Sequence, residues 1–402
     1  MRILVIADYL PYPHISGDRI RIFNLLKRAA SRHEIYLAAM LEKPEDIEGV
    51  STLSQFCARV ETANFEQRSR LEKLPGLLGY ALSGKPPELK LLYSSELVEK
   101  IKQLTAKIEF DIVQIEHARM GLYLEALPSC AHRKSLLMFH NFTSQQYGRV
   151  SQVERRWDRK FRTWLNSLAM GYWEPRYAGK FDRCVTVSEV DRQLLLASNP
   201  RLHVDVIPNG VDTELYQPLP FGESSPSLLF LGNMGYPPCV DAVLYFCKEI
   251  FPLVRQMNDA AEFWIVGRDP RPEVLDLDGG HVHVTGRVDD VLPFYQKCPI
   301  CVVPLRAGGG TRLKILEAMA LGRPVVSTTI GCEGLDVRDG EHILIADTPA
   351  EFAEKTVRLF HDRELYQRLA SNGRRLVEQK YGWDQITATL LDIYADMAEV
   401  HA

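Results

Sequence analysis

Short apolar runs of strand length recur along this 402-residue chain, and stretches with apolar residues at helical spacing lie between them. The first run, residues 3–7, is uninterrupted and rich in β-branched side chains, as in a parallel strand buried on both faces. The alternation of strands with helices predicts a parallel sheet with right-handed crossovers. In the first half of the chain the predicted strands are residues 3–7, 35–39, 111–115, 135–139, 184–187 and 204–207.

A second series of the same kind follows a join near residues 208–212 and the Pro-, Gly- and Ser-rich stretch 217–227. We therefore predict an α/β protein of two Rossmann-like, doubly wound parallel-sheet domains, residues 1–210 and 211–380, that face a cleft. In such folds ligands bind at the loops that follow the carboxyl ends of the strands. The predicted strands of the second series are residues 227–231, 263–266, 282–285, 300–305, 324–328 and 343–346.

Composition and charge narrow the class of protein. Apolar residues make up 46% and charged residues 25% of the chain, which excludes disordered and fibrous classes. No apolar run reaches about 18 residues, so we expect no membrane-spanning helix, and the start is charged too soon for a signal peptide. The net charge is +6 for residues 1–210 and −10 for residues 211–402, so the sequence does not support a uniformly basic nucleic-acid binder and no nucleic-acid partner is expected.

Eight scattered cysteines, most of them beside apolar residues, predict buried free thiols in a reducing cytoplasm. Cys298 and Cys301 form a lone CxxC pair. A zinc site needs a second pair or histidines at suitable spacing, and the sequence offers neither. We therefore expect no metal site.

The densest chemical signal lies in residues 304–327, which are predicted to form a strand, a glycine turn, a helix and a second strand. The glycines at 308–310 let backbone N–H groups approach an anion at the amino end of that helix, which carries partial positive charge. Arg312 and Lys314 oppose that charge unless an anion is bound, and this favours a diphosphate ligand. Glu317 lies on the same helix face as Lys314 and is placed to accept hydrogen bonds from sugar hydroxyls. The alternative is a glycine turn with surface charges.

Two further loops follow strands of the first half. Gly17 lies in a turn between the first strand and a helix, where backbone can approach a ligand. His140 ends an apolar strand and is predicted to project into the cleft, unless it is a capping or core histidine. Glu116 and His117 end the preceding strand in the same way, so one side chain of this group is placed to orient another.

Residues 154–165 are both basic and aromatic, with five cations and two acids. Trp157, Phe161, Trp164 and Leu165 recur at helical spacing, with cations between them. This pattern fits a helix that lies on an anionic membrane surface. The alternative is an ordinary amphipathic helix packed on its domain.

Four segments of the chain resemble the family 4 glycosyltransferases, which are retaining, nucleotide-sugar-dependent enzymes of the GT-B fold. The resemblance runs through nearly the whole chain and is typical of bacterial members that act in surface-polysaccharide assembly. It implies an N-terminal acceptor-side domain, a C-terminal nucleotide-sugar-binding domain, and a last helix, residues 381–402, that crosses back to the first domain. The segments that carry it are residues 304–327, 206–212, 230–233 and 284–290.

The resemblance also implies roles for single residues. Glu317 matches the second glutamate of the E-x7-E motif, which holds the donor ribose. Arg312 and Lys314 lie where the family contacts the donor diphosphate, and His140 matches the histidine at the sugar and acceptor end. Arg312, Lys314 and His140 are the expected catalytic groups. The residues expected to bind the donor are Gly17, Gly286, Val288, Gly308, Gly309, Gly310, Thr311 and Glu317.

Two positions depart from the family pattern. Gly309 replaces the first glutamate of E-x7-E, which contacts donor-sugar hydroxyls in the family. Asn233 stands where a basic pair is often found. Three arginines are candidates to supply the lost charge, namely Arg306, Arg268 and Arg287.

The expected activity is transfer of a hexosyl unit from a UDP- or GDP-sugar to a hydroxyl of a glycan or lipid-linked acceptor, with retention and without a metal or other cofactor. Cations, glycine amides and the helix end would stabilise the leaving diphosphate. The alternatives are a nucleotide-sugar epimerase of the same fold and a non-catalytic member that binds a nucleotide sugar. The expected location is the cytoplasm, with peripheral contact at the inner face of an anionic membrane.

Overall fold

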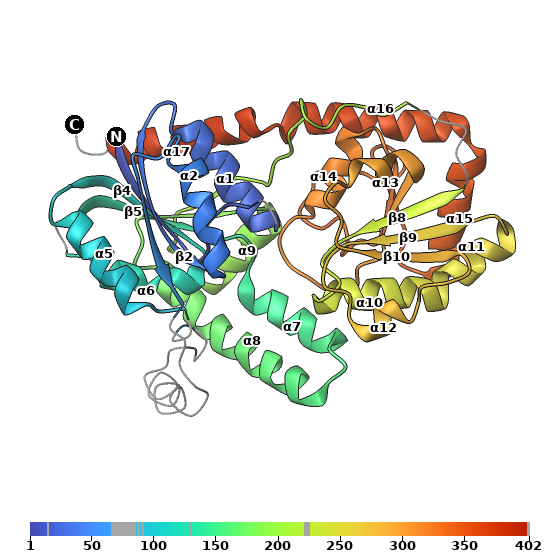
Figure 1. Ribbon diagram of the computed structural model, residues 1–402, viewed down its shortest axis with the longest axis horizontal. Coiled ribbons are helices and arrows are strands. Elements are labelled where there is room, and N and C mark those ends of the chain that lie inside the picture. The colour runs from blue at the N-terminus through green and yellow to red at the C-terminus, as the bar shows by residue number, and fades with distance from the viewer. Residues whose placement is uncertain are drawn as a thin grey trace. The chain divides into compact units, whose positions relative to one another are not determined.

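The computed structural model of the chain describes residues 1–13, 16–65, 86, 89, 92–128, 131–220 and 226–399. Its contacts divide the chain into two compact units (Figure 1). The first unit contains Met1–Gln145, Leu165–Asn209 and Trp383–Ala402, and the second contains Gln146–Trp164 and Gly210–Gly382. The predicted first domain, residues 1–210, differs from this division at residues 146–164, because side chains of that segment bond within the second unit.

The first unit is built on a seven-stranded sheet in the order β3-β2-β1-β4-β5-β6-β7, and every neighbouring pair is parallel. The strand order reverses between β1 and β4, which makes this the switch point where doubly wound sheets place ligands. All residues of β1 after the first are buried, as its apolar run predicts. The strands are β1 (Arg2–Ala7), β2 (Glu34–Leu41), β3 (Arg59–Asn64), β4 (Phe110–Glu116), β5 (His132–Met138), β6 (Arg183–Thr186) and β7 (Val204–Val206).

Helices of the first unit connect these strands, and α1 and α17 lie side by side on the sheet (Figure 1). Arg28 of α1 bonds Asp384 of α17 at 2.6 Å. The C-terminal helix therefore packs on the first unit. The helices are α1 (Gly17–Ala29), η1 (Pro44–Glu48), α2 (Gly49–Leu53), α5 (Ser95–Thr105), η2 (Ala118–Met120), α6 (Leu122–Glu125), α7 (Thr143–Val153), α8 (Trp157–Ala178), α9 (Glu189–Ser198) and α17 (Trp383–Glu399), of which α7 and the start of α8 extend into the second unit.

The second unit holds a six-stranded parallel sheet in the order β10-β9-β8-β11-β12-β13. Its strand order reverses between β8 and β11, so this unit also has a switch point. The strands are β8 (Ser227–Leu231), β9 (Glu262–Val266), β10 (Val282–Gly286), β11 (Ile300–Val303), β12 (Val325–Ser327) and β13 (Leu344–Ile345).

Local signals explain several helix boundaries of this unit. Pro237 and Pro238 open α10, where a missing N–H costs nothing. The Thr348 hydroxyl accepts the N–H of Glu351 at 3.4 Å, so the predicted cap of α15 is present. The helices are α10 (Pro237–Tyr245), the π-turn η3 (Phe246–Ile250), α11 (Phe251–Met257), α12 (Pro272–Leu275), α13 (Leu292–Lys297), α14 (Leu313–Ala320), α15 (Pro349–His361) and α16 (Arg363–Lys380).

The predicted fold class, two parallel-sheet α/β domains, is confirmed. The sequence pattern missed β3, because in this edge strand only Ala63 is buried. Cys57, Cys184, Cys239, Cys247, Cys298, Cys301 and Cys332 are free thiols, whereas Cys130 lies outside the described residues. Among the helices that the structure describes, none has the length and hydropathy needed to cross a bilayer.

Candidate active site

The glycine turn and helix predicted for residues 304–327 are present in the second unit. After β11 the chain turns through the glycines and enters α14, with Arg312 at its N-cap position. Gly308 has a φ of 134° and Gly310 a φ of 67°, a region that side-chain-bearing residues rarely adopt. The backbone of this turn is therefore built on glycine, as a close approach to a ligand requires.

Arg312 folds back over the same turn. Its side chain is buried, and Nη1 donates to the carbonyl oxygen of Gly309 at 2.5 Å and to that of Gly310. Burial lowers the pKa of Arg312, although the guanidinium stays a cation at neutral pH. A Cβ added at Gly308 would lie 2.9 Å from Nη2 of Arg312, so the glycine makes room for the guanidinium.

Lys314 places its ammonium group inside the protein. Its Nζ lies 4.1 Å from the ring centroid of Phe230, and it is buried with no hydrogen-bond partner in the described part of the chain. Burial lowers the pKa of Lys314. A Cβ added at Gly232, just after β8, would lie 3.1 Å from Nζ, so the lysine reaches the carboxyl end of the neighbouring strand. The hydroxyl of Thr311 is also buried without a partner among these residues.

Glu317 lies on α14 close to Lys314. Burial raises the pKa of this carboxyl to about 7, and the Lys314 ammonium partly offsets the rise. Two other residues of the expected donor site belong to the same unit. Gly286 ends β10 at a φ of 69°, and Val288 packs against the core of the second unit. The second unit thus holds all the residues expected around the donor except Gly17 and His140.

In the first unit, His140 is buried and bonded to Glu116. The distance from His140 Nε2 to Glu116 Oε2 is 2.7 Å, so the predicted pairing of these two strand ends is present. The amide of Gln114 donates to the other carboxylate oxygen at 2.6 Å. The hydroxyl of Tyr394 on α17 donates in turn to Gln114 at 2.5 Å. A buried chain of hydrogen bonds thus runs from the C-terminal helix to His140.

His117 stacks on His140 with 3.9 Å between the ring centroids. Its Nε2 lies 3.5 Å from Asp8 Oδ1 and 3.8 Å from Asp18 Oδ2, and Asp18 follows Gly17 at the start of α1. Burial and the neighbouring His140 hold the pKa of His117 well below its usual value. Gly17, His117 and His140 therefore lie together at the carboxyl edge of the first sheet. Sequence reasoning missed Asp8, although its position directly after the first strand was a signal.

Arg149 of α7 and Glu333 form an ion pair within the second unit that the sequence did not predict. Nη2 of Arg149 donates to Glu333 Oε1 at 2.9 Å, and Nη1 donates to Oε2. Nη1 also donates to the carbonyl oxygen of Gly308 at 3.2 Å. The pair therefore ties the glycine turn, where the family glutamate is missing, to α7.

In the described part of the chain, no side-chain bond links the three arginines considered as replacement cations to the glycine turn, Arg312 or Lys314. Arg306 is held by Asp241 through two hydrogen bonds of 3.0 and 2.6 Å. Arg268 lies 3.7 Å from Asp269, and Arg287 is exposed. Within the described residues, no group of three or more His, Cys, Asp or Glu side chains is placed to hold a metal ion.

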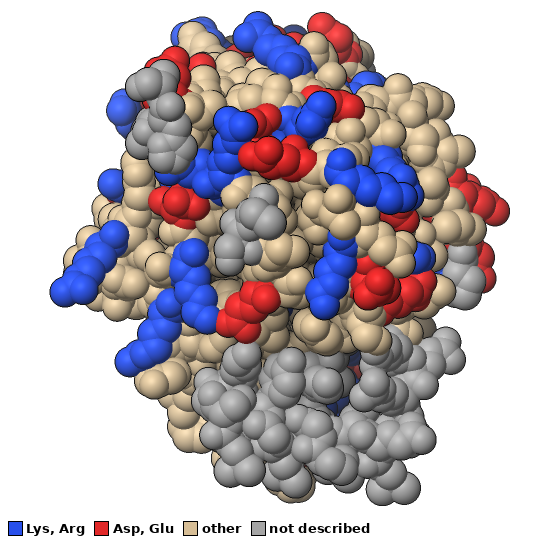
Figure 2. Space-filling model, turned by 90° about the vertical axis from the view of Figure 1, so that its left-hand side faces the viewer, with Lys and Arg blue, Asp and Glu red and all other residues tan. Residues whose placement is uncertain are grey.

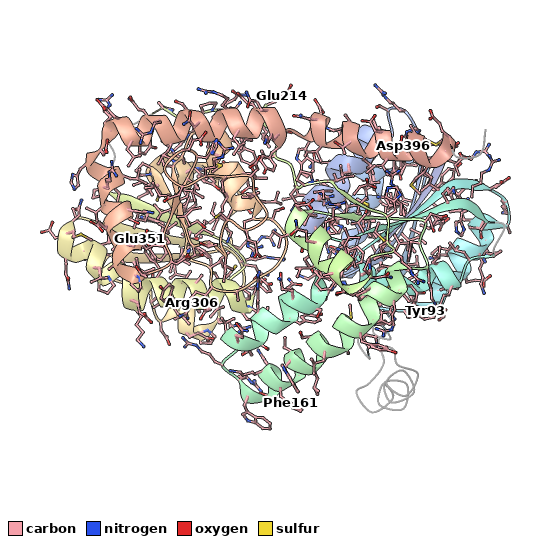
Figure 3. All side chains as sticks on the ribbon, turned by 180° about the vertical axis from the view of Figure 1, so that it is seen from behind. Tyr93, Phe161, Glu214, Arg306, Glu351 and Asp396 are labelled. Carbon is pink, nitrogen blue, oxygen red and sulfur yellow. The ribbon has the colours of Figure 1, made fainter. Side chains whose placement is uncertain are left out.

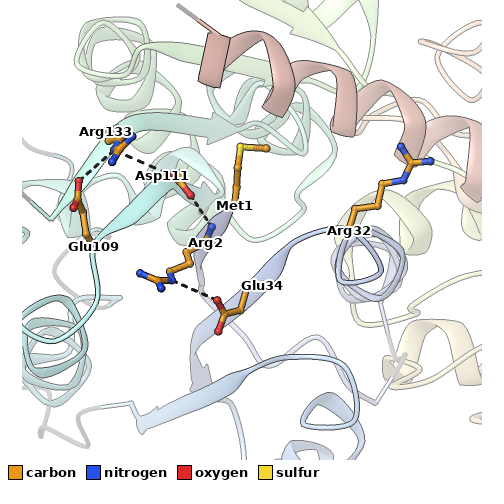
Figure 4. Close-up of a pocket in the computed structure, with 7 residues that line it drawn as sticks. All are labelled: Met1, Arg2, Arg32, Glu34, Glu109, Asp111 and Arg133. Carbon is orange, nitrogen blue, oxygen red and sulfur yellow. Dashed lines mark hydrogen bonds and ion pairs between the residues drawn. The ribbon is translucent and has the colours of Figure 1, made fainter. Parts of the chain in front are cut away.

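A separate polar pocket of about 470 Å³ lies at the amino edge of the first sheet, away from the strand ends described above (Figure 4). Its charged groups pair with one another, as Arg2 does with Glu34 at 3.4 Å and Arg133 with Glu109 at 3.2 Å. Figure 2 shows basic and acidic side chains interspersed over this end of the molecule. Three arginines and three carboxylates line the pocket, so its side chains favour neither an anion nor a cation.

Comparison with known families decides the class of protein. Residues 16–215 match the family model described as Glycosyltransferase Family 4, and residues 225–362 match the one described as Glycosyl transferases group 1. The chain belongs to glycosyltransferase family 4. The expected enzyme class, a hexosyltransferase with two GT-B-type domains, is thereby confirmed.

Three proteins illustrate how this glycosyltransferase relates to others. It is 23% identical to an uncharacterized 44.6 kDa protein in the cps region of Klebsiella pneumoniae, over 97% of this chain and 98% of that protein. It is 28% identical to a phosphatidyl-myo-inositol mannosyltransferase of Mycobacterium leprae, but only over 48% of this chain and 53% of that enzyme. Its fold matches Anabaena HepE in complex with UDP and glucose, with a TM-score of 0.69 and 16% identity, over 98% of this chain and all of the other.

Proposed function

We propose that this glycosyltransferase moves a hexosyl unit, with retention of anomeric configuration, from a UDP- or GDP-sugar to a hydroxyl of a glycan or lipid-linked acceptor. The proposal needs no metal ion, because Arg312, Lys314 and the amino end of α14 supply the positive charge that a leaving diphosphate requires. It places the enzyme in the cytoplasm, at the inner face of a membrane that carries the acceptor.

The observation that carries this proposal is the buried ammonium group of Lys314. A buried polar atom without a partner is rare in folded proteins and indicates a site for a ligand. The unpartnered atom here is a cation, and it stands on the helix that follows a glycine turn. A phosphate oxygen would give it the partner it lacks, together with the backbone N–H groups of the turn.

Relatives support the choice of donor and acceptor. The Mycobacterium leprae relative is named for transfer of mannose to phosphatidyl-myo-inositol. The structure of Anabaena HepE is described as a complex with UDP and glucose. We extend to this chain the hexosyl group that both names share, a nucleotide-linked donor from the second, and a lipid-linked acceptor from the first.

In the proposed step, the bond between the anomeric carbon and the diphosphate oxygen breaks, and its electron pair stays on the diphosphate. The acceptor oxygen bonds to the anomeric carbon on the same face, and its proton passes to the leaving phosphate oxygen. Arg312 and Lys314 stabilise the developing negative charge. Glu317 accepts hydrogen bonds from the donor ribose, and His140, held by Glu116, orients the sugar or the acceptor hydroxyl.

The test incubates the protein with UDP- and GDP-sugars, each with and without a lipid-linked acceptor, and follows the anomeric signals by NMR. Acceptor-dependent transfer with the donor's configuration is expected, and full activity is expected in EDTA. Conversion of the donor without any acceptor would identify an epimerase instead. An inverted product would refute retention, and a strict requirement for a divalent metal would refute the charge assignment.

A further inference from the structure

One face of α8 exposes a continuous apolar stripe. Residues on the opposite face, including Met170, Trp173 and Tyr177, are buried in the first unit. The stripe residues, by contrast, are between 44% exposed, at Leu165, and 81% exposed, at Trp157. Figure 3 shows Phe161 projecting outward from this helix. The stripe consists of Trp157, Phe161, Trp164, Leu165, Leu168 and Tyr172.

The spacing of these residues makes them one surface. At about 100° per residue they fall within an arc of roughly 100° around the helix axis. Most of the large apolar side chains found exposed in the described residues belong to this stripe. An apolar face of this extent on a helix that is packed on its other side marks a surface for a partner.

Cations border the stripe. By the same geometry, Lys160 lies about 40° beyond one edge of the arc and Arg162 about 60° beyond the other, with Asp158 between Arg162 and the stripe. Arg176 stacks on Tyr172 at 3.6 Å and adds a cation at the far end. The acid nearest to them, Asp158, is bonded to Arg156 at 3.0 Å. The rim of the apolar stripe is therefore positively charged.

We propose that the stripe on α8 docks on the surface of an anionic lipid bilayer, with the aromatic and leucine side chains in the acyl boundary and Lys160 and Arg162 at the headgroups. Aromatic and aliphatic side chains flanked by cations are the composition that favours this interface. A second copy of the chain fits less well, because it would bring a like-charged rim against this one. The inference rests on the proposed function in one respect only. That function supplies the reason for docking, namely an acceptor carried by a lipid.

The test is co-sedimentation of the full chain with vesicles of phosphatidylcholine alone and of phosphatidylcholine mixed with phosphatidylglycerol. We expect binding to the mixed vesicles, at least tenfold weaker binding to the neutral ones, and weakening by added salt. Trp157 and Trp164 are exposed, so their fluorescence should shift to the blue on the mixed vesicles.

Phe161→Asp should lower vesicle binding at least tenfold. Lys160→Gln combined with Arg162→Gln should lower it to a similar degree.

The matched control is Leu215→Asp, which changes an apolar residue of the second unit that is 64% exposed, against 56% for Phe161, and which should bind vesicles as the wild type does. Vesicle binding by Phe161→Asp as strong as that of the wild type would overturn the proposal. So would a dimer, detected by sedimentation velocity, that the same substitution dissociates. UDP titration of Phe161→Asp separates the two proposals, because donor affinity should stay at the wild-type value. Vesicle binding without any nucleotide binding would retain the docking surface and reject the proposed activity.

Discussion

The hydroxyl of Tyr394 lies 2.5 Å from the side-chain oxygen of Gln114, although 280 residues separate the two in the chain. Gln114 in turn holds the carboxylate that bonds His140. We therefore expect Tyr394→Phe to lower kcat roughly tenfold with little change in KM for the donor, because His140 loses its fixed position. Steady-state kinetics measures both constants.

Tyr123→Phe is the control for that substitution. Its hydroxyl is also buried in the first unit, where it bonds the carbonyl of Leu92 at 2.9 Å. Tyr394→Phe should lose about 1 kcal/mol of stability, as removal of one hydrogen bond predicts, and Tyr123→Phe about 2 kcal/mol, because its hydroxyl also accepts the N–H of Ser94 at 2.8 Å. Equal kcat values in the two variants would show that the Tyr394 contact serves stability alone.

Gly308→Ala should displace Arg312 and lower transfer at least tenfold, because the new Cβ would lie 2.9 Å from the guanidinium. The backbone at Gly308 has a φ of 134°, so strain of about 1–3 kcal/mol accompanies the change. Gly279→Ala supplies a comparable strain at a φ of 137° with open space around the Cβ. An assay of both variants tests the contact, since equal activities would assign the whole effect to strain.

Glu317→Gln should stabilise the ligand-free protein above neutral pH while lowering donor affinity. Burial raises the pKa of Glu317 to about 7 from 4.5, so the folded state binds the proton more tightly than the unfolded state. The contribution of this group to stability therefore falls as pH rises from about 4.5 to about 7, and it stays low above that. The melting temperature of the variant should exceed that of the wild type at pH 8 and approach it near pH 5. A constant difference across this range, or one matched by the exposed control Glu364→Gln, would contradict the assignment.

Glu333→Gln should raise KM for the donor several-fold and leave kcat nearly unchanged, because Arg149 then loses its ionic partner and holds the carbonyl of Gly308 less firmly. Asp241→Asn breaks a comparable two-bond pair with Arg306 and should leave both constants at wild-type values. Donor-saturation curves distinguish the variants. Parallel effects in the two would mean that the Arg149 contact has no special relation to the glycine turn.

Much of the fold follows from local sequence pattern. Buried parallel strands are apolar throughout, as residues 3–7 of β1 are, so their positions can be predicted from local sequence alone. The glycine turn before Leu313 was also predictable, because glycine, cation and helix start are adjacent in the chain. The edge strand β3 was not, since one solvated face and a polar composition leave it without a distinct pattern.

The contacts that complete the site depend on the tertiary fold. Arg149 and Glu333 lie 184 residues apart, and nothing in either local sequence indicates the pair. The bond from Tyr394 requires the C-terminal helix to pack on the first unit, which only a family resemblance suggested. His140 and Glu116 were an easier case, because consecutive strands of a parallel sheet place their carboxyl ends side by side.

Turnover of Lys314→Ala tests the central claim, that a nucleotide sugar binds with its diphosphate at the buried ammonium group. Loss of one hydrogen-bond donor that stabilises charge in the transition state lowers kcat by about 10²–10³-fold. Lys297→Ala is the matched control, because that lysine also lies over an aromatic ring, 3.8 Å from Trp264, but outside the site. We predict a loss of at least about 100-fold for Lys314→Ala, with weaker UDP binding, and wild-type turnover for Lys297→Ala. Near-normal turnover of Lys314→Ala would contradict the account.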